Sequence, residues 1–159
     1  MTIINYFFIF NAKYLYLLAG VIALFWFLKL PREKKKEVVI FGSITLPIMF
    51  VVLQIVASLY FDPRPFIVDN FTPLVPHDPD NGFPSDHVLL LSAIASIIFP
   101  FGKKIASVIF AMAILTGISR VYVGIHHPID IVGSIIIAGV IAMLMYPVFE
   151  KITKKHIIL

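Results

Sequence analysis

Cysteine is absent from this 159-residue sequence, which excludes disulfide bonds and metal sites built on thiolates. Charged residues are also scarce, at 14%, whereas hydrophobic residues make up 60%. A soluble domain is about half apolar and about a quarter charged. No basic residue precedes Lys13, so a cleaved signal peptide is not expected. The composition therefore excludes an ordinary soluble fold and indicates an integral membrane protein.

Five apolar stretches alternate with shorter polar connections along the chain. A helix needs about 20 apolar residues, with a range of roughly 17–25, to cross a bilayer. The third stretch is short and is expected to include a polar turn before Val88. We predict an all-α integral membrane protein, a bundle of about five transmembrane helices in one domain spanning residues 1–159. The predicted spans are 14–28, 38–60, 88–101, 105–123 and 129–149.

Two segments outside these spans have a distinct composition. Residues 3–10 are aromatic-rich and too short to span a bilayer. They are expected either to form an N-terminal interfacial helix or to extend the first span past Lys13. Residues 61–84 contain closely spaced prolines, which exclude a regular helix there. A connection this long is usually functional or disordered, and in such a short chain we expect a functional one.

The basic residues predict the orientation in the membrane. One side of the predicted topology carries only Arg64 and Arg120, with Lys13 near the start, and it also holds all six aspartates. The positive-inside rule places the lysine-rich side in the cytoplasm, so segments 61–86 and 120–130 share the outer face. Membrane topology thus accounts for the net charge of +4, and no nucleic-acid partner is expected. The cytoplasmic set is Lys29, Arg32, Lys34, Lys35, Lys36, Lys103, Lys104, Lys151, Lys154 and Lys155.

Three polar clusters fall on that outer face, and they read FDPRPF, GFPSDH and SRVYVGIHHPID. Ionisable groups at bilayer depth are functional candidates by default. Arginine suits phosphate because its planar fork makes two charged hydrogen bonds, and a helix N-terminus adds free N–H groups. Histidine can act as a nucleophile or a proton donor near neutral pH. The combination favours phosphoryl transfer through a phosphohistidine, a reaction that needs no metal.

Each of these residues also has a structural explanation when taken singly. An arginine can anchor a loop among headgroups, serine and aspartate are common helix N-caps, and an acid suits the first turn of a helix. His77 and His127 are expected to be structural or peripheral. The joint appearance of the others on one face favours a functional site. Those with single-residue explanations are Arg64, Ser85, Asp86, His87 and Asp130.

The three clusters resemble the three-part signature of the type 2 phosphatidic acid phosphatase superfamily, here PRP, PSDH and SR-x5-H-x3-D. Two positions depart from the usual pattern, since Asp86 replaces a common glycine and Ala57 stands where a phosphate-binding lysine is usual. Both departures are similar to the bacitracin-resistance branch, the undecaprenyl-diphosphatases, as are the stretches YFDPRPF, VPH and FPSDH. The third part matches in full, at Ser119, Arg120, His126 and Asp130.

The resemblance implies a role for each matched residue. His126 would be the nucleophile, Asp130 would orient and activate it, and His87 would protonate the leaving group and later activate the hydrolytic water. Asp86 would cap the third span or tune His87. No metal or cofactor is implied. The phosphate would be bound by Arg64, Ser85 and Arg120.

The implied reaction is hydrolysis of undecaprenyl diphosphate to undecaprenyl phosphate and inorganic phosphate. It would take place at the extracytoplasmic face of the cytoplasmic membrane and serve carrier-lipid recycling and bacitracin resistance. The partners would be the polyprenyl diphosphate and membrane lipids. Three alternatives stay open: a phosphatase for phosphatidylglycerophosphate or phosphatidic acid, a lipid-diphosphate-binding protein without activity, and a small membrane transporter.

One geometric requirement accompanies this mechanism. His126 precedes Pro128, and proline prefers the first helical turn, so His126 is expected just outside the last helix. A regular i, i+4 pair with Asp130 is then not assured. We predict that the two side chains are in contact, either directly or through one water.

Overall fold

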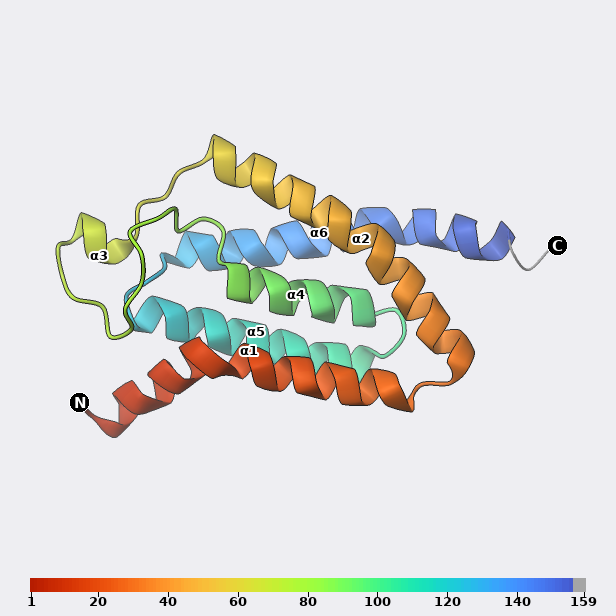
Figure 1. The fold of residues 1–159 in the computed structure, drawn as a ribbon, viewed down its shortest axis with the longest axis horizontal. Coiled ribbons are helices and arrows are strands. Elements are labelled where there is room, and N and C mark those ends of the chain that lie inside the picture. The colour runs from red at the N-terminus through yellow and green to blue at the C-terminus, as the bar shows by residue number, and fades with distance from the viewer. Residues whose placement is uncertain (156–159) are drawn as a thin grey trace.

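The computed structural model describes residues 1–155 and is a bundle of helices (Figure 1). Residues 156–159, the last of the predicted single domain, lie outside the described part. Within residues 1–155 there is no strand, only an isolated bridge between Pro63 and Asn81. The prediction of an all-α fold is confirmed. The helices are α1 (Ile3–Lys29), α2 (Arg32–Leu59), α3 (Pro65–Val68), α4 (Asp86–Ile98), α5 (Lys103–Tyr122) and α6 (Pro128–Lys155).

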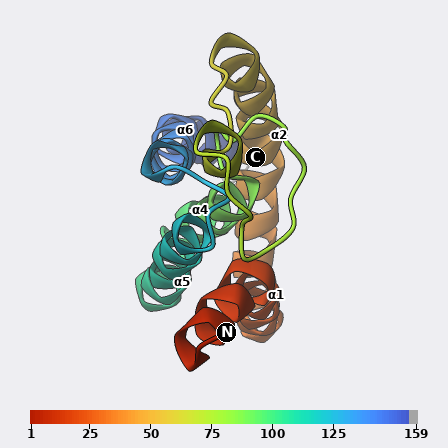
Figure 2. The same cartoon turned by 90° about the vertical axis from the view of Figure 1, so that its left-hand side faces the viewer.

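Helix α4 lies in the middle of the bundle, where it packs against α1, α2, α5 and α6 (Figures 1 and 2). In the described part, the four surrounding helices are long and apolar enough to cross a membrane. With 13 residues, α4 is only about 20 Å long, less than the hydrocarbon thickness of about 30 Å. It begins with the polar turn at Asp86 that the sequence predicted, and the other helices shield it from lipid.

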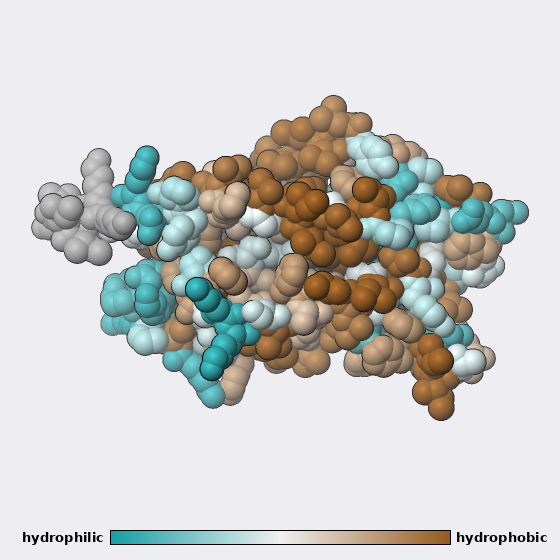
Figure 3. Space-filling view, turned by 180° about the vertical axis from the view of Figure 1, so that it is seen from behind, coloured by the Kyte–Doolittle hydropathy of each residue, from teal (hydrophilic) through white to brown (hydrophobic). Residues whose placement is uncertain are grey.

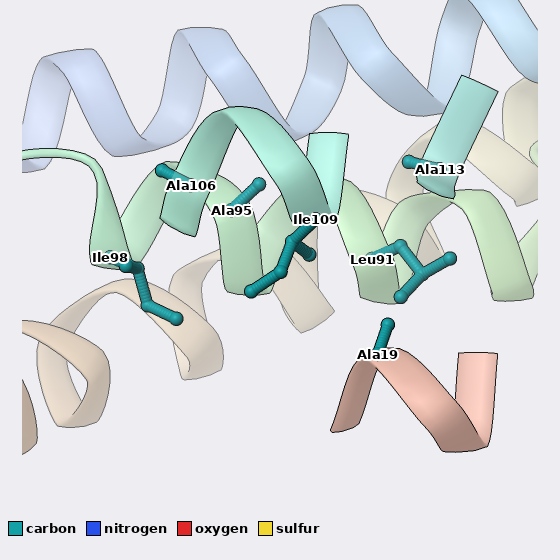
Figure 4. Close-up of a cluster of buried hydrophobic side chains, with 7 residues drawn as sticks. All are labelled: Ala19, Leu91, Ala95, Ile98, Ala106, Ile109 and Ala113. Carbon is teal, nitrogen blue, oxygen red and sulfur yellow. The ribbon is translucent and has the colours of Figure 1, made fainter. Parts of the chain in front are cut away.

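Small side chains let α4 approach its neighbours closely. One buried cluster joins α1, α4 and α5, and four of its seven members are alanines (Figure 4). Small residues at helix contacts bring backbones together, which is how helices associate where lipid weakens the hydrophobic driving force. The cluster thereby fixes the depth of α4, and with it the position of the polar turn at its start. Its members are Ala19, Leu91, Ala95, Ile98, Ala106, Ile109 and Ala113.

The outer surface of the bundle is apolar in its middle and polar at both ends (Figure 3). Large apolar side chains point outward from the long helices, among them those of Phe50, Val132 and Leu144. A continuous belt of such side chains is costly in water and marks a surface that lipid covers. The long apolar helices and this belt make the chain a multi-pass membrane protein.

Helix α2 begins at Arg32, six residues earlier than the predicted span. The lysine run after Pro31 is therefore helical and is not a loop. Ion pairs one turn apart support it, Lys34 to Glu37 at 2.9 Å and Lys36 to Glu33 at 3.1 Å. Such pairs stabilise an exposed helix modestly, so the helix extends past its apolar part.

The N-terminal residues 3–10 form the first turns of α1, so the observed placement is the extension of the first span. Contacts with α5 hold this extension. The rings of Phe8 and Tyr122 stack with centroids 4.0 Å apart, and the Tyr122 hydroxyl donates to Asn5 Oδ1 at 2.9 Å. A separate interfacial helix is not present.

The three polar clusters meet at one end of the bundle (Figure 1). This end holds α3, the start of α4 and the turn between α5 and α6. Gly124 closes that turn with a φ of +84°, where an added Cβ would lie 2.6 Å from the Phe71 ring. The predicted gathering of segments 61–86 and 120–130 on one face is confirmed. Within segment 61–84 the short helix α3 is the one helical turn.

Candidate active site

Arg64 lies at the centre of the polar end, directly before α3. Its side chain is only 5% exposed, so it does not anchor a loop among lipid headgroups. Its Nε and Nη2 donate to Asp80 Oδ1 at 3.0 and 2.8 Å, and Nη1 donates to the carbonyl of Ile125 at 2.9 Å. These bonds orient the guanidinium and leave its Nη1 facing the imidazole of His126, 3.0 Å from Nε2.

His126 lies in the turn between α5 and α6 and is 2% exposed. Its Nδ1 is 2.9 Å from Asp130 Oδ2, so the predicted contact across Pro128 is direct and is confirmed. Helix α6 begins at Pro128, as expected from the preference of proline for the first turn. When the N–H group at Nδ1 donates a hydrogen bond to the carboxylate, the proton of the neutral ring is on Nδ1, and Nε2 has the free lone pair.

The surroundings of His126 also keep it neutral. Burial, followed by the charges of Arg120 and Arg64, lowers the pKa of His126 to about 2. Since only the neutral ring has a free nitrogen lone pair, the nucleophilic form persists over the whole physiological pH range. An acid limb of activity near neutral pH would then come from another group.

Asp130 is completely buried in the first turn of α6. Besides the imidazole, its Oδ2 accepts the backbone N–H of His127 at 2.9 Å. Gly82 lies against it, where an added Cβ would come within 3.0 Å of Oδ2. The glycine that opens GFPSDH therefore leaves room for the carboxylate, and the helix N-terminus favours its charge.

Among the buried donors of the described residues that have no hydrogen-bond partner, two belong to candidate site residues. One is Nε of Arg120, whose Nη1 donates to the Ala12 carbonyl at 3.2 Å. The other is the hydroxyl of Ser85, which occupies the N-cap position of α4 without making a side-chain capping bond. Buried polar groups are normally satisfied, so these two are suited to a bound anion. Ser85 thus holds the expected N-cap position, but its hydroxyl does not cap the helix.

His87 and Asp86 occupy the first turn of α4. The half-buried His87 ring lies edge-on to Tyr16, with centroids 4.5 Å apart. It is close enough to Arg120 and His126 to interact electrostatically with both. Asp86 is exposed at the helix start, as expected of an acid that complements the helix dipole. Tuning of His87 by Asp86 stays a prediction.

Two further residues belong to this site although the sequence did not single them out for it. Asp80 holds the fork of Arg64 through the bonds described above. The ring centroids of His77 and His126 are 6.4 Å apart, so His77 is beside the candidate nucleophile and is not peripheral. His127 has the expected structural role, because its Nε2 contacts the Pro63 carbonyl at 3.2 Å. The acid-rich stretch HDPDN could have indicated that this loop takes part in the site. Its spacing does not show that Asp80 is the acid that pairs with Arg64.

Asn81 connects the proline-rich loop to the end of α2. Its Oδ1 accepts the N–H groups of Asp62 at 2.9 Å and Phe83 at 3.0 Å. Its Nδ2 donates to the carbonyls of Ala57 at 3.0 Å and Tyr60 at 2.9 Å. The backbone at Ala57, where the resembling family usually has a lysine, thus serves to anchor the loop.

Replacing Asn81 by Ala is expected to lower the stability by roughly 2–6 kcal/mol, because four hydrogen bonds of about 0.5–1.5 kcal/mol each are lost. Asn81→Asp keeps the two acceptor bonds and is expected to lie between wild type and Asn81→Ala. Thermal unfolding in detergent would show this order, with the exposed Thr72→Ala as control. Equal melting temperatures for all variants would contradict the anchoring role.

A cavity of about 380 Å³ borders the site on the side of α3. Its wall includes His126, His127, Tyr122 and Asp69. The buried imidazole therefore has open space on one side, through which water or a small anion can approach it.

Comparison with known proteins assigns this arrangement to a family. The family model described as the PAP2 superfamily matches residues 38–154, which is most of the chain and includes every site residue above. The chain belongs to the PAP2 superfamily. The PAP2 signature residues that the sequence analysis matched, Arg64, Ser85, His87, Arg120, His126 and Asp130, are those that meet at the polar end.

Relatives and solved structures agree with the PAP2 assignment. The chain is 33% identical over 115 residues to undecaprenyl-diphosphatase BcrC of Bacillus subtilis, covering 72% of this chain and 60% of that protein. It is 30% identical over 149 residues to the bacitracin transport permease protein BcrC of Bacillus licheniformis, covering 92% and 72%. The crystal structure of Aquifex aeolicus LpxE shares the fold, with a TM-score of 0.66, 24% identity and coverage of 91% and 86%.

Proposed function

We propose that the protein is a membrane lipid phosphatase that hydrolyses undecaprenyl diphosphate to undecaprenyl phosphate and inorganic phosphate. The observation that carries the proposal is the arrangement around His126. Its Nδ1 is held by Asp130 at 2.9 Å, and its Nε2 faces the buried guanidinium of Arg64 at 3.0 Å. This arrangement suits nucleophilic attack on a phosphate that the arginines hold.

In the first step, Nε2 of His126 attacks the terminal phosphorus. A P–N bond forms, the bond from phosphorus to the bridging oxygen breaks, and undecaprenyl phosphate leaves. Burial, and after it the charge of Arg120, lowers the pKa of His87 to about 4, and the negative charge of a bound diphosphate would oppose this shift. In its protonated form, His87 gives its proton to that oxygen. Asp130 stabilises the positive charge that develops on the imidazole. The transferred phosphoryl group is bound by Arg64, Arg120 and the hydroxyl of Ser85.

In the second step, water attacks the phosphohistidine. The neutral His87 takes a proton from the water, the P–N bond breaks, and inorganic phosphate is released. His126 returns to its neutral form and His87 again carries its proton. Every proton and bond is accounted for by side chains of this site, so the proposed cycle is independent of a metal ion.

We place the site at the extracytoplasmic face of the plasma membrane. The support is the distribution of charge over the bundle. The end opposite the site carries the basic residues that flank the helices, such as Lys29, Arg32 and Lys103, and the positive-inside rule assigns that end to the cytoplasm. The substrate diphosphate would then be that of a carrier lipid exposed outside, and its dephosphorylation would recycle the carrier and counter bacitracin. The domain would be residues 1–159.

Purified protein in the presence of a chelator is expected to release phosphate from undecaprenyl diphosphate. Turnover of phosphatidylglycerophosphate and phosphatidic acid is expected to be slower by a factor of at least about ten. The reason is that one extra charge-assisted contact to the second phosphate contributes about 1.5 kcal/mol, and 1.4 kcal/mol corresponds to a factor of ten. The measurement is phosphate release at matched lipid concentration in mixed micelles.

Three outcomes would change the assignment. Faster turnover of the monophosphate lipids would favour the alternative substrates. Activity lost with chelator and restored by a divalent cation would contradict the metal-independent cycle. A transporter or an inactive lipid-binding protein would release no phosphate from any of these lipids.

A further inference from the structure

The carboxyl group of Asp130 has a second carboxyl group against it, that of Asp62. The two side chains are in hydrogen-bonding contact. Each has one buried oxygen without another partner among the described residues, Oδ2 of Asp62 and Oδ1 of Asp130. Because Oδ2 of Asp130 is already engaged by His126 and His127, its free Oδ1 is the oxygen available to Asp62.

Two carboxylates can be joined by a hydrogen bond only if they share a proton, since an ionised carboxylate is an acceptor only. The surroundings show which group holds it. Burial opposes the charge of Asp130, but its Oδ2 accepts from the backbone of His127 and from the ring of His126. The field of Arg64 and the N-terminus of α6 also favour its charged form. Burial, and after it the charge of Asp130, raises the pKa of Asp62, and only His127 and His126 oppose this.

The backbone of Asp62 is fixed from two sides. Its N–H donates to Asn81 Oδ1 at 2.9 Å, and its carbonyl accepts the N–H of Gly82 at 2.8 Å. The next carbonyl, that of Pro63, contacts the ring of His127 at 3.2 Å. These hydrogen bonds restrict the backbone at Asp62, and its side chain is therefore held next to Asp130.

We propose that Asp62 is a positioning residue that donates its carboxyl proton to Asp130 Oδ1 and so turns Oδ2 of Asp130 toward His126. The inference rests on the proposed function of His126 and Asp130. Held in this way, Asp130 keeps its negative charge behind the imidazole. Asp62 adds no negative charge near the phosphate site, because it is neutral.

The pH dependence follows from this arrangement. As the pH rises through the raised pKa of Asp62, the shared proton is lost, the two carboxylates repel each other, and the orientation of Asp130 is lost with it. Activity is therefore expected to fall on the alkaline side of that pKa. Below it, Asp62 keeps its proton and its titration has no further effect on activity.

The test compares Asp62→Ala, Asp62→Asn and Asp62→Glu with the exposed Asp78→Asn as control. Outer partners of a catalytic ligand typically contribute about 10- to 100-fold, and Asp62→Ala is expected to lower kcat by that factor with little change in KM. Asp62→Asn still donates a hydrogen bond, so it is expected to keep most of kcat and to lose the alkaline fall. Asp62→Glu and the control are expected to behave like wild type.

A second measurement does not depend on the substrate. The infrared band of a protonated buried carboxyl group is expected in the wild-type protein near neutral pH and is expected to be missing from Asp62→Asn. Absence of that band from the wild type, or full kcat and an unchanged pH profile in Asp62→Ala, would overturn the proposal. If the wild type dephosphorylated no lipid while the band was present, the proposed function would fail and the shared proton would stand.

Discussion

Replacing His126 by Ala is expected to reduce phosphate release from undecaprenyl diphosphate by at least about 10³-fold, as is found when a covalent nucleophile is removed. The loss follows because Nε2, which faces Arg64 at 3.0 Å, is the atom that would bond to phosphorus. Acid-labile phosphate trapped on His126 of the wild-type protein, and absent from the variant, would show the intermediate directly by mass spectrometry.

The matched control is the neighbouring histidine. His127→Gln keeps a donor for the Pro63 carbonyl, which the His127 ring contacts at 3.2 Å, and is expected to retain most of the activity. Both variants should unfold at temperatures close to that of the wild type. Phosphate release that survives the loss of the His126 ring in a folded protein would contradict the mechanism.

Replacing Asp130 by Asn is expected to lower kcat by about 10³- to 10⁴-fold, as for the corresponding acid of catalytic triads. The amide can still accept a hydrogen bond from Nδ1 of His126, so the ring is held. It cannot balance the positive charge that forms on the imidazole during attack. The KM is expected to change little, because Asp130 is completely buried behind the ring and does not touch phosphate.

Comparison with the exposed Asp78→Asn separates this effect from a general loss of negative charge at the polar end. Asp78→Asn is expected to match the wild type in both kcat and KM. A rise in KM without a fall in kcat for Asp130→Asn would place the carboxylate in substrate binding, and would contradict its proposed role.

Much of the bundle was predictable because helix length in a membrane depends on local composition. The first residues of α5 and α6 lie within a few residues of the first residues of the predicted spans. Helix α4 begins with the predicted polar turn at Asp86. The start of α2 was missed because Lys–Glu ion pairs one turn apart stabilise a helix without apolar residues. The course of residues 3–10 was undecided because it depends on Tyr122, more than 100 residues away.

The site was predictable only where its residues lie close in sequence. His126 and Asp130 are four residues apart, and a carboxylate in the first helical turn can fold back onto the residue before Pro128. The fork of Arg64 is held by Asp80, 16 residues away across a proline-rich loop. No periodicity governs such a loop, so its pairings could not be read from spacing.

Three properties of this protein follow from its amino-acid sequence: it lies in a membrane, its polar clusters share one face, and a set of motif residues forms the candidate site. Apolar length and the placement of lysines are sufficient for the first two, since they act through the bilayer and do not require knowledge of packing, and the motif residues came from the resemblance to the family signature. The folded structure was needed to show the direct contact of His126 with Asp130, the unpaired donors of Ser85 and Arg120, and the contact of Asp62 with Asp130. Those depend on how the loop after α2 folds over the ends of three helices, where hydrogen bonds and burial select one arrangement among many.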